Sequence, residues 1–366
     1  MKRSLILTAL LTLVLGANVT AWAQQKQKPK AGAAKTGKHY SLPATSETTQ
    51  WGWLDPNEKP KLTVESGDTI SVETLLHSLD QIKPGVTMDE IVRLRLANPG
   101  GGPHSVTGPI YVNGAEPGDT LEIRIRKIVP KPDAFDFHLP GTKFPTVGIL
   151  APEFPEGSVR YYKLDLVKRQ TEFKPGIVLD LKPFPGILAV GVDPNEPKEK
   201  AGPPIRDAKG RTSTLRPWKN GSNMDLNELQ AGSTFYVPVF LKGGLIWIGD
   251  AHCRQGNGEV ELTALECAYK EIEIQPILRK DLKIEWPRAE TSTHWILMGY
   301  DEDLNEAMKI AVRETVNFLS SQAPVPMSRD EAYALASLTA DCRVTQVVDI
   351  RKGVHCMVPK SIFVKK

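Results

Sequence analysis

The sequence predicts an α+β fold, with a β-rich, sandwich-like body followed by helices that are segregated in the C-terminal third. Three observations lead to this prediction. Over the first two thirds, short apolar runs alternate with polar residues at a period of two, which is typical of half-buried strands. The 29 prolines and 29 glycines break these runs into short pieces. Beyond residue 300, the apolar residues recur at helical spacing.

The first 23 residues have the pattern of a secretory signal peptide. A positive start at residues 2–3 precedes an apolar core at 5–15 and a small-x-small cleavage signal at 21–23. The apolar core is too short to span a bilayer, although an uncleaved membrane anchor is the alternative interpretation. We therefore expect residues 1–23 to be removed and the mature protein to be exported, to the periplasm or the extracellular space.

A Lys- and Gln-rich stretch at 24–40 has almost nothing to bury, so we expect it to be a disordered tail. The remaining residues, 41–366, are enough for one large domain or two closely packed ones, and no stretch in them is apolar enough to span a membrane. Without Lys2 and Arg3, the formal net charge falls from +3 to +1. This balance gives no reason to propose a nucleic acid as the partner.

The four cysteines, Cys253, Cys267, Cys342 and Cys356, form no C-x-x-C pair. Their even number in an exported chain permits two disulfides. Small buried thiols are an equally good interpretation for Cys267 and Cys342. The sequence leaves both interpretations open.

Short strands account for the predicted body. Residues 63–72 are strand-like around a turn at 66–68, and the stretch from Gly108 gives two strands around a turn at 115–119. In the second of these, apolar and charged residues alternate from Leu121 to Arg126, so one face is expected to be buried and the other to meet water. Further strands are expected at 235–239, 245–248, 260–265 and 269–274.

Two long segments interrupt these strands. Residues 131–155 are rich in Pro, Phe and Gly, and residues 193–223 have few apolar side chains to bury. A compact domain seldom carries a loop of that length unless it is a lid, a binding loop or an oligomer contact. We expect such a role for 193–223, with disorder as the competing interpretation.

The C-terminal third is predicted to begin with two helices. Apolar residues fall at helical spacing between 304 and 319, with Asp301 or Asp303 available as the N-cap. Ser328 and Glu331 form a capping box that starts a second, shorter helix. Beyond the helices we expect a strand at 344–350 and, after a turn at 352–353, a final stretch at 354–363.

Residues 247–259, WIGDAHCRQGNGE, carry the clearest signal of chemistry. An apolar run leads into Asp250 and His252, whose side chains would share one face of an extended strand. A Gly-rich turn then delivers Glu259. An acid and an imidazole on one face, with a second acid returning across a turn, could hold a divalent metal or activate water.

His104 is the second candidate, because GGGPHSVTGP would present it on a constrained loop just ahead of a strand. Together with Asp250 and His252, it offers the nitrogen and oxygen donors of a catalytic zinc centre. The spacing alone does not separate a metal site from a structural His–Asp pair. His77 and His138 lie near apolar or aromatic residues, and we interpret them as structural.

Other catalytic layouts lack their motifs in this chain. No G-x-S-x-G elbow is present, so the usual serine hydrolase arrangement has no support. No Gly-rich phosphate loop ends in Lys-Ser or Lys-Thr, and no G-x-G-x-x-G opens a strand–helix unit. Nucleotide and dinucleotide chemistry are therefore not expected.

In these same stretches the chain resembles the acetamidase/formamidase family. The matching segments occur in the family's order from about residue 60 onward, and the G-A-E-P-G-D and G-D-x-H-x-x-Q-G-x-G-E signatures are specific. The segments are HSVTGPIYVNGAEPGD at 104–119, NMDL at 223–226, GSTFYVPV at 232–239, IGDAHCRQGNGE at 248–259, YDEDLNEA at 300–307 and VTQVVDIRKGVH at 344–355.

The resemblance implies hydrolysis of short aliphatic amides, such as formamide or acetamide, to carboxylate and ammonia. It also implies a β-rich fold that forms a homodimer or a higher homo-oligomer. A divalent metal, zinc in the first place, is implied as cofactor, with its site motifs at His104, Asp250 and His252.

The resemblance also places three other residues near the pocket. Asn223 and Asp225 match an N-x-D element expected there, and we interpret them as substrate-binding. Glu259 closes the second signature, and our hypothesis is that it takes the proton of water and passes it to the leaving nitrogen. The alternative for Glu259 is a turn carboxylate that binds backbone N–H groups.

The chain departs from the family pattern inside its clearest motif. Asn257 stands where the family usually has Asp, and Cys253 and Arg254 are larger or more reactive than expected. Two alternatives to short-amide hydrolysis therefore stay open. The chain could bind a small polar ligand without hydrolysing it, or it could hydrolyse a larger amide in a pocket widened by residues 193–223.

Overall fold

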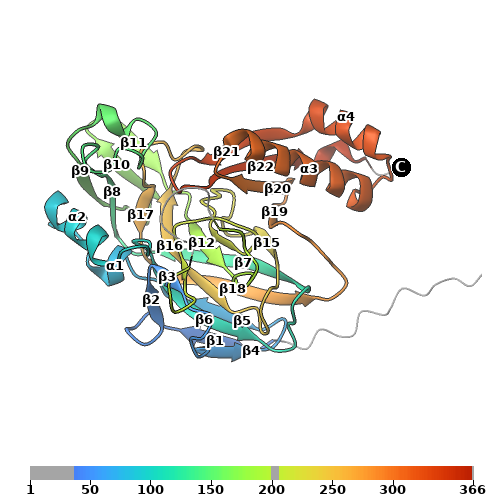
Figure 1. Cartoon of the computed structure of the whole chain (residues 1–366), viewed down its shortest axis with the longest axis horizontal. Helices are drawn as coiled ribbons and strands as arrows, with labels where there is room; N and C mark the ends of the chain where they lie inside the picture. The colour runs from blue at the N-terminus through green and yellow to red at the C-terminus, as the bar shows by residue number, and fades with distance from the viewer. Residues whose placement is uncertain (1–36, 199–205, 365–366) are drawn as a thin grey trace, which may run out of the picture. The chain divides into compact units, whose positions relative to one another are not determined.

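Two nine-stranded β-sheets dominate the part of the chain that the computed structural model describes, residues 37–198 and 206–364. The first sheet has the order β1-β5-β18-β7-β15-β19-β20-β22-β21. The second has the order β14-β12-β16-β17-β8-β9, and β6 joins it by pairing with β16, β2 and β4 (Figure 1). The predicted signal peptide, residues 1–23, lies outside the described residues.

The strands are β1 (His39–Leu42), β2 (Thr49–Trp51), β3 (Trp53–Leu54), β4 (Leu62–Val64), β5 (Thr69–Val72), β6 (Ser105–Val112), β7 (Thr120–Pro130), β8 (Asp133–His138), β9 (Ser158–Lys163), β10 (Gln170–Lys174), β11 (Ile177–Asp180), β12 (Phe184–Ala189), β13 (Thr212–Ser213), β14 (Gly221–Asn223), β15 (Thr234–Pro238), β16 (Ile246–Arg254), β17 (Leu265–Cys267), β18 (Tyr269–Arg279), β19 (Arg288–Glu290), β20 (His294–Asp301), β21 (Asp341–Gln346) and β22 (Lys352–Pro359). The helical elements are α1 (His77–Asp80), α2 (Met88–Ala97), η1 (Ala151–Glu153), α3 (Leu304–Gln322), α4 (Arg329–Thr339) and η2 (Lys360–Ile362).

The predicted α+β class and its sandwich-like body are confirmed. Apolar residues of both sheets share one fully buried core, with Ile123 and Val237 from the first sheet and Leu188 and Ile248 from the second. Burial of this kind is the main term that stabilises a fold, at about 25 cal/mol for each Å² of apolar surface removed from water. The shared core therefore fixes the positions of the strands of both sheets, β16 among them.

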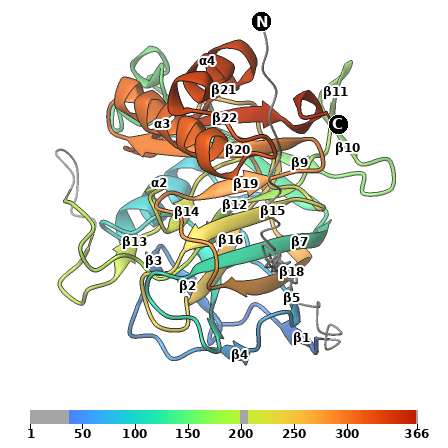
Figure 2. The same cartoon turned by 90° about the vertical axis from the view of Figure 1, so that its right-hand side faces the viewer.

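The C-terminal helices lie where the sequence predicts them. Helix α3 starts at the N-cap Asp303, whose carboxylate accepts the backbone N–H groups of Asn305 and Glu306. The capping box of Ser328 and Glu331 starts α4 as expected. Buried side chains of α3 and α4 pack together with residues of β20 and β22 at this end of the first sheet (Figure 2). Because α3 and α4 both pack against β20 and β22, the two helices lie together at this end of the sheet.

Several predicted boundaries were wrong. His39 and Tyr40, expected at the end of the disordered tail, instead open β1, because they pair in parallel with Thr69 and Ile70 of β5. Residues 260–264 are not a strand; the strand starts only at Leu265. No turn separates Lys352 from Gly353, since β22 already begins at Lys352 and the chain turns earlier, at residues 347–351. In each case the partner strand, which local pattern does not show, decides the boundary.

Two further features differ from the sequence prediction. Helix α2 was not predicted, although Thr87 and Glu90 form a capping box at its start. Glu122 was placed on the wet face of β7, yet it is only 5% exposed, because Arg124 and Arg279 bind its carboxylate. The capping box of α2 is a local signal in the sequence. The burial of Glu122 instead depends on Arg279, a distant residue that the alternation of β7 does not show.

All four cysteines are paired. One disulfide joins Cys253 of β16 to Cys267 of β17, and the other joins Cys342 of β21 to Cys356 of β22. Each pair is separated by 14 positions in the sequence. The interpretation of Cys267 and Cys342 as free buried thiols is therefore wrong. Among the described residues, no helix is long and apolar enough to cross a membrane.

Candidate active site

A cavity of about 760 Å³ opens beside the middle of β16. Polar residues from β14, β16, β17, α1 and the segment before β6 line one part of it. The polar lining residues on which the site argument rests are His77, His104, Asn223, Asp250, His252, Glu259, Glu266 and Asp349. A large concave pocket with converging polar groups is the default location of an active site.

Asp250 lies at a break in the second sheet. On one side β16 pairs continuously with β12, but on the other it pairs first with β6, as far as Gly249, and then with β17, from Ala251 onward. Asp250 falls between these two partners and has a positive φ of 52°. That conformation is uncommon for a residue other than Gly, and such strain concentrates at functional sites.

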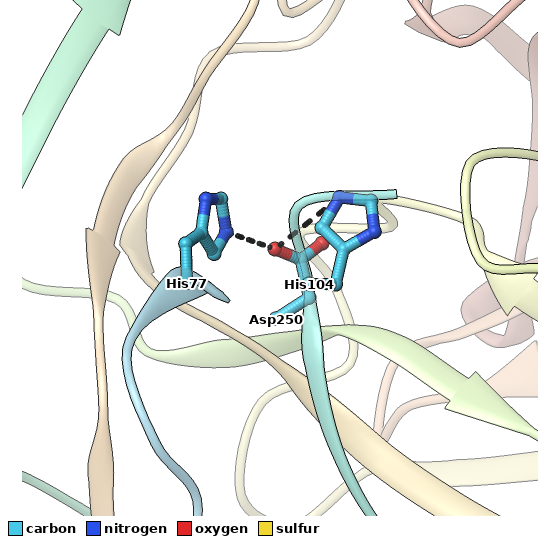
Figure 3. A group of neighbouring side chains, drawn as sticks. All are labelled: His77, His104 and Asp250. Carbon is cyan, nitrogen blue, oxygen red and sulfur yellow. Dashed lines mark hydrogen bonds and ion pairs between the residues drawn. The ribbon is translucent and has the colours of Figure 1, made fainter. Parts of the chain in front are cut away.

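The carboxylate of Asp250 lies between two imidazole rings (Figure 3). Nε2 of His77 lies 2.9 Å from Oδ1 of Asp250, and Nε2 of His104 lies 3.9 Å from the same oxygen. The Nδ1 atom of His104 lies 2.9 Å from the hydroxyl of Thr214, which fixes the ring orientation. All three of His77, His104 and Asp250 are buried, and their ligand atoms lie within 4.8 Å of one another.

A second set of contacts extends this group. Nε2 of His252 lies 3.3 Å from Oδ2 of Asp250 and 3.3 Å from Oε2 of Glu266. The same Oε2 atom is 3.2 Å from Nε2 of His77. Asp250 and His252 therefore share one face of β16, as the strand alternation predicted, and Glu266 reaches the same place from the neighbouring strand β17. The hydroxyl of Tyr269 donates to the backbone carbonyl of His252 at 2.7 Å and so holds this part of β16.

The electrostatics of the cluster follow from burial and opposite charge. Burial lowers the pKa of His104 to about 4, so its ring is neutral near pH 7. Burial acts in the same direction on His77, but the carboxylates of Glu266 and Asp250 outweigh it and raise the pKa of His77 to about 9. For Glu266, burial acts to raise the pKa, and the rings of His252 and His77 outweigh it and lower the pKa to about 2. The buried carboxylate of Glu266 is thus charged near pH 7 and requires positive partners.

A group of acids and an amide adjoins this cluster. Oδ1 of Asp225 lies 3.8 Å from Nδ1 of His252, and Glu259 offers an oxygen within 4.8 Å of both. Burial raises the pKa values of Asp225 and Glu259 well above their usual range, and it raises the pKa of Asp349 to about 7. Carboxyl groups this close cannot all be ionised together. The group can therefore hold a proton near neutral pH.

Backbone geometry brings these side chains together. Like Asp250, both Asp225 and Glu259 have positive φ, at 53° and 42°. A Cβ atom on Gly186 would lie 2.4 Å from Oδ2 of Asp250 and 2.7 Å from Oδ1 of Asp225, so only Gly leaves room for both carboxylates there. Gly249 has a similar role behind the site, where a Cβ atom would lie 2.1 Å from the carbonyl of Ser105 in β6.

The six residues named from the sequence all gather here. Asp250 lies beside His104 and His252, and Asn223, Asp225 and Glu259 lie on the side of His252. His77, interpreted from the sequence as a structural histidine, lies in the cluster, where its ring contacts Asp250 and Glu266. His138, the other histidine interpreted in that way, lies outside the cluster and meets Phe154 edge to face.

Glu266 and Asp349 were also missed. Glu266 carried a usable signal: an acid between Leu265 and Cys267 in an apolar strand must be buried, and a buried acid needs a partner. Asp349 lies in the matching segment at 344–355, where neither the residue spacing nor the resemblance predicts a role for it. His77 carried no local signal, because α1 is a turn with left-handed backbone at Ser78 and Leu79 rather than a patterned helix.

The donor set fits a divalent cation. Several buried polar atoms around the cavity have no hydrogen-bond partner within the described residues, although such atoms are rare in folded proteins. They are both ring nitrogens of His252, Oε2 of Glu266, Oε2 of Glu259, both carboxylate oxygens of Asp225, Oδ1 of Asn223 and Oδ2 of Asp349. Imidazole nitrogens with carboxylate oxygens are the ligands that suit zinc and similar ions.

Comparison with known proteins gives a consistent picture. The sequence model of the acetamidase/formamidase family matches residues 43–202 and 199–365. A formamidase of Methylophilus methylotrophus is 27% identical over 247 residues, which cover 58% of this chain and 60% of that protein. An acetamidase of Mycolicibacterium smegmatis is 29% identical over 199 residues, covering 43% of this chain and 49% of that protein. The chain thus spans about half to three fifths of the length of the curated relatives it matches.

A solved structure extends the similarity over nearly the whole fold. The crystal structure of an acetamidase from Yersinia enterocolitica is 27% identical in sequence and superposes with a TM-score of 0.75. The superposition covers 92% of this chain and 96% of that one. The two sheets and the C-terminal helices described above therefore belong to an arrangement that this protein shares with that acetamidase.

Proposed function

The chain belongs to the acetamidase/formamidase family, and from that premise we propose that it hydrolyses the C–N bond of linear amides, formamide and acetamide among them, to carboxylate and ammonia. One observation carries the proposal. Two imidazoles and a carboxylate, those of His77, His104 and Asp250, meet in a buried cluster at the wall of a cavity. The names of the similar proteins, formamidase and acetamidase, support the same reaction.

A divalent cation, zinc in the first place, is part of this proposal. The residues that would hold it are His104, Asp250 and His252, joined by His77 and Glu266. Such a cation, when bound, lowers the pKa of water toward neutrality and polarises a carbonyl group. Every one of these side chains is buried, so their charges are screened less by solvent than charges at the surface.

The remaining steps fall to the chain's own groups. Glu259 lines the cavity on the side of Asp225, and in its ionised form it would take a proton from the attacking water. It would then deliver that proton to the amide nitrogen, because ammonia leaves readily only after protonation. Oδ1 of Asn223 is buried without a partner and would accept an N–H bond from the amide. Asp225 faces Nδ1 of His252 and would orient that ring.

Export of the protein is a further part of the proposal. The pattern of residues 1–23 lies outside the described residues, but the disulfides support it. Both pairs, Cys253–Cys267 and Cys342–Cys356, are of a kind that persists in oxidising compartments such as the periplasm or the extracellular space. We also propose a homodimer or a higher homo-oligomer; the exposed apolar residues Tyr333 and Leu338 of α4, at 63% and 82%, support a subunit contact there.

Release of ammonia tests the proposed reaction. Purified mature protein supplied with zinc is expected to release ammonia from formamide and acetamide, and Asp250→Asn is expected to abolish the release while the protein stays folded. Asp281→Asn, which changes the same kind of side chain at an exposed position after β18, outside the cavity lining, is the matched control and should keep full activity. Tight binding of amide by the wild-type protein without ammonia release would show a non-catalytic binding protein instead.

A further inference from the structure

The cavity is much larger than the amides named above require. Its volume is about 760 Å³, whereas acetamide occupies roughly 100 Å³, or about three water volumes of ~30 Å³ each. A polar site at one wall therefore leaves most of the cavity for another part of the ligand. What that part is depends on the chemistry of the remaining walls.

Those walls are apolar and belong to one hydrophobic cluster. They come from the region of α2, from the end of β8 and the irregular chain after it, and from the turn that follows Glu259. The lining members of this cluster are Ile82, Ile91, Phe137, Leu139, Val147 and Leu262. The first four are at most 4% exposed, so the wall is packed and preformed. A preformed apolar wall beside a few polar groups is the usual design of a small-molecule pocket.

The apolar surface continues outward from the cavity. A neighbouring hollow of about 210 Å³ shares Leu139, Val147 and Ile149 with it. Around this hollow, Ile149, Phe154 and Val260 are 53%, 51% and 60% exposed. A continuous apolar path therefore leads from solvent to the polar cluster.

The cationic residues of the lining already have protein partners. Nη1 of Arg95 donates to the carbonyl of Gly101 at 2.8 Å, and burial lowers the pKa of Arg95. Nζ of Lys352 donates to the carbonyl of Glu302. An anionic substituent on the ligand would have to compete with these carbonyl groups for Arg95 and Lys352. An uncharged apolar substituent would instead bury its surface against the apolar wall without displacing any contact.

We propose that the preferred substrates are primary amides that carry an apolar group, aryl or medium-chain alkyl, which lies against this wall. The inference rests on the proposed function and specifies its substrate class. The reaction is unchanged: a C–O bond to water's oxygen forms, the C–N bond breaks, and the nitrogen takes a proton and leaves as ammonia. Of the described residues in the long segment 193–223, only Leu215 and Asn223 line the cavity, and the apolar wall described above comes from the 131–155 segment and α2.

A homologous series of amides tests this inference. With the zinc-loaded protein, kcat/KM for ammonia release is measured for acetamide, butyramide, hexanamide and phenylacetamide. Each methylene removed from water should raise kcat/KM by roughly fourfold until the wall is covered. A flat series, or one that falls with size while acetamide is hydrolysed, overturns the substrate class and leaves the proposed function intact. No ammonia from any member overturns the proposed function itself.

A matched pair of variants locates the effect. Leu262→Trp narrows the cavity at a half-buried position, while Leu96→Trp makes the same change on α2 outside the cavity lining, where Leu96 is 63% exposed. The first variant should lower kcat/KM for phenylacetamide at least tenfold and leave acetamide within about twofold; the second should change neither. If the amide series is flat and Ile149→Asp breaks an oligomer, the apolar surface is a contact between copies of the chain, and the proposal is overturned.

Discussion

The Nε2 atom of His77 lies 2.9 Å from Oδ1 of Asp250, although 173 positions separate these residues in the sequence. The contact joins a left-handed turn, α1, to the break in the second sheet where Asp250 lies. The same ring nitrogen lies 3.2 Å from Oε2 of Glu266, so His77 contacts two buried carboxylates of the cluster, and we propose that it belongs to the candidate site.

His77→Gln is therefore expected to weaken zinc binding by roughly ten- to a hundredfold, the usual cost of losing a group in or beside a metal site. The activity for acetamide should fall with it. His138→Gln is the control, because His138 lies near the cavity but outside the cluster. Competition with a coloured chelator gives the zinc affinity of both variants. Equal affinities for the two variants would return His77 to a structural role.

Glu259→Gln tests the proposed proton transfer. The amide keeps the size and polarity of the side chain but cannot take a proton from water, so kcat should fall by about 10²- to 10⁴-fold. Metal content, measured by elemental analysis, should stay at the wild-type level. Full turnover by a folded Glu259→Gln protein would instead favour the turn carboxylate as the role of Glu259.

The two disulfides offer a comparison at equal loop length, since each spans 14 positions. Removing either should reduce the free energy of unfolding by about 3 kcal/mol in the chain-entropy description. Cys253 follows His252, and Cys267 follows Glu266, so only the first disulfide ties together two strands of the site. We expect the double variant Cys253→Ala/Cys267→Ala to lose zinc affinity, and Cys342→Ala/Cys356→Ala to keep it. Equal zinc affinity in the two double variants would show that the first disulfide does not support the metal site.

The pH dependence of stability has a source outside the site. Oε1 of Glu228 lies 3.3 Å from Nη1 of Arg343 and 3.5 Å from Nε2 of His355. Burial acts to raise the pKa of Glu228, but the contacts with His355 and Arg343 outweigh it and hold the pKa below its usual 4.5. A lowered pKa in the folded state means stability that is present above pH 4.5 and is lost as the pH falls through the folded value.

Urea unfolding between pH 3 and 6 measures this contribution. The free energy of unfolding of the wild-type protein should fall more steeply below pH 4.5 than that of Glu228→Gln, which has no carboxyl group to protonate at this position. Parallel curves for the two proteins would show that Glu228 does not contribute to acid sensitivity.

The sequence predicted those features that depend on a single strand or a single helix. Asp250 and His252 share a face because a strand alternates, and Ser328 caps α4 because a capping box is a local pattern. The Gly-rich context of His104 also pointed to that residue, whereas Asn223, Asp225 and the expected reaction came from the family resemblance.

The site residues that the sequence did not predict depend on contacts between distant segments of the chain. His77 reaches the site through a turn without periodicity, and Glu266 becomes a neighbour of His252 only when β17 pairs with β16. Cys253 stood out as a departure from the family pattern, and its partner Cys267 explains it. Asn257, the other departure, accepts a hydrogen bond from Asn227 at 2.9 Å and lies at the turn, so it stabilises the turn and does not enter the cluster.

The central claim is that the buried cluster around Asp250 holds a divalent cation that amide hydrolysis requires. Stripping the protein with a chelator and then titrating it with zinc, while ammonia release from acetamide is followed, tests this claim most directly. We predict no release from the stripped protein and a rise with added zinc that saturates at a whole number of equivalents per chain, with none in Asp250→Asn. Full release from the stripped protein would contradict the claim.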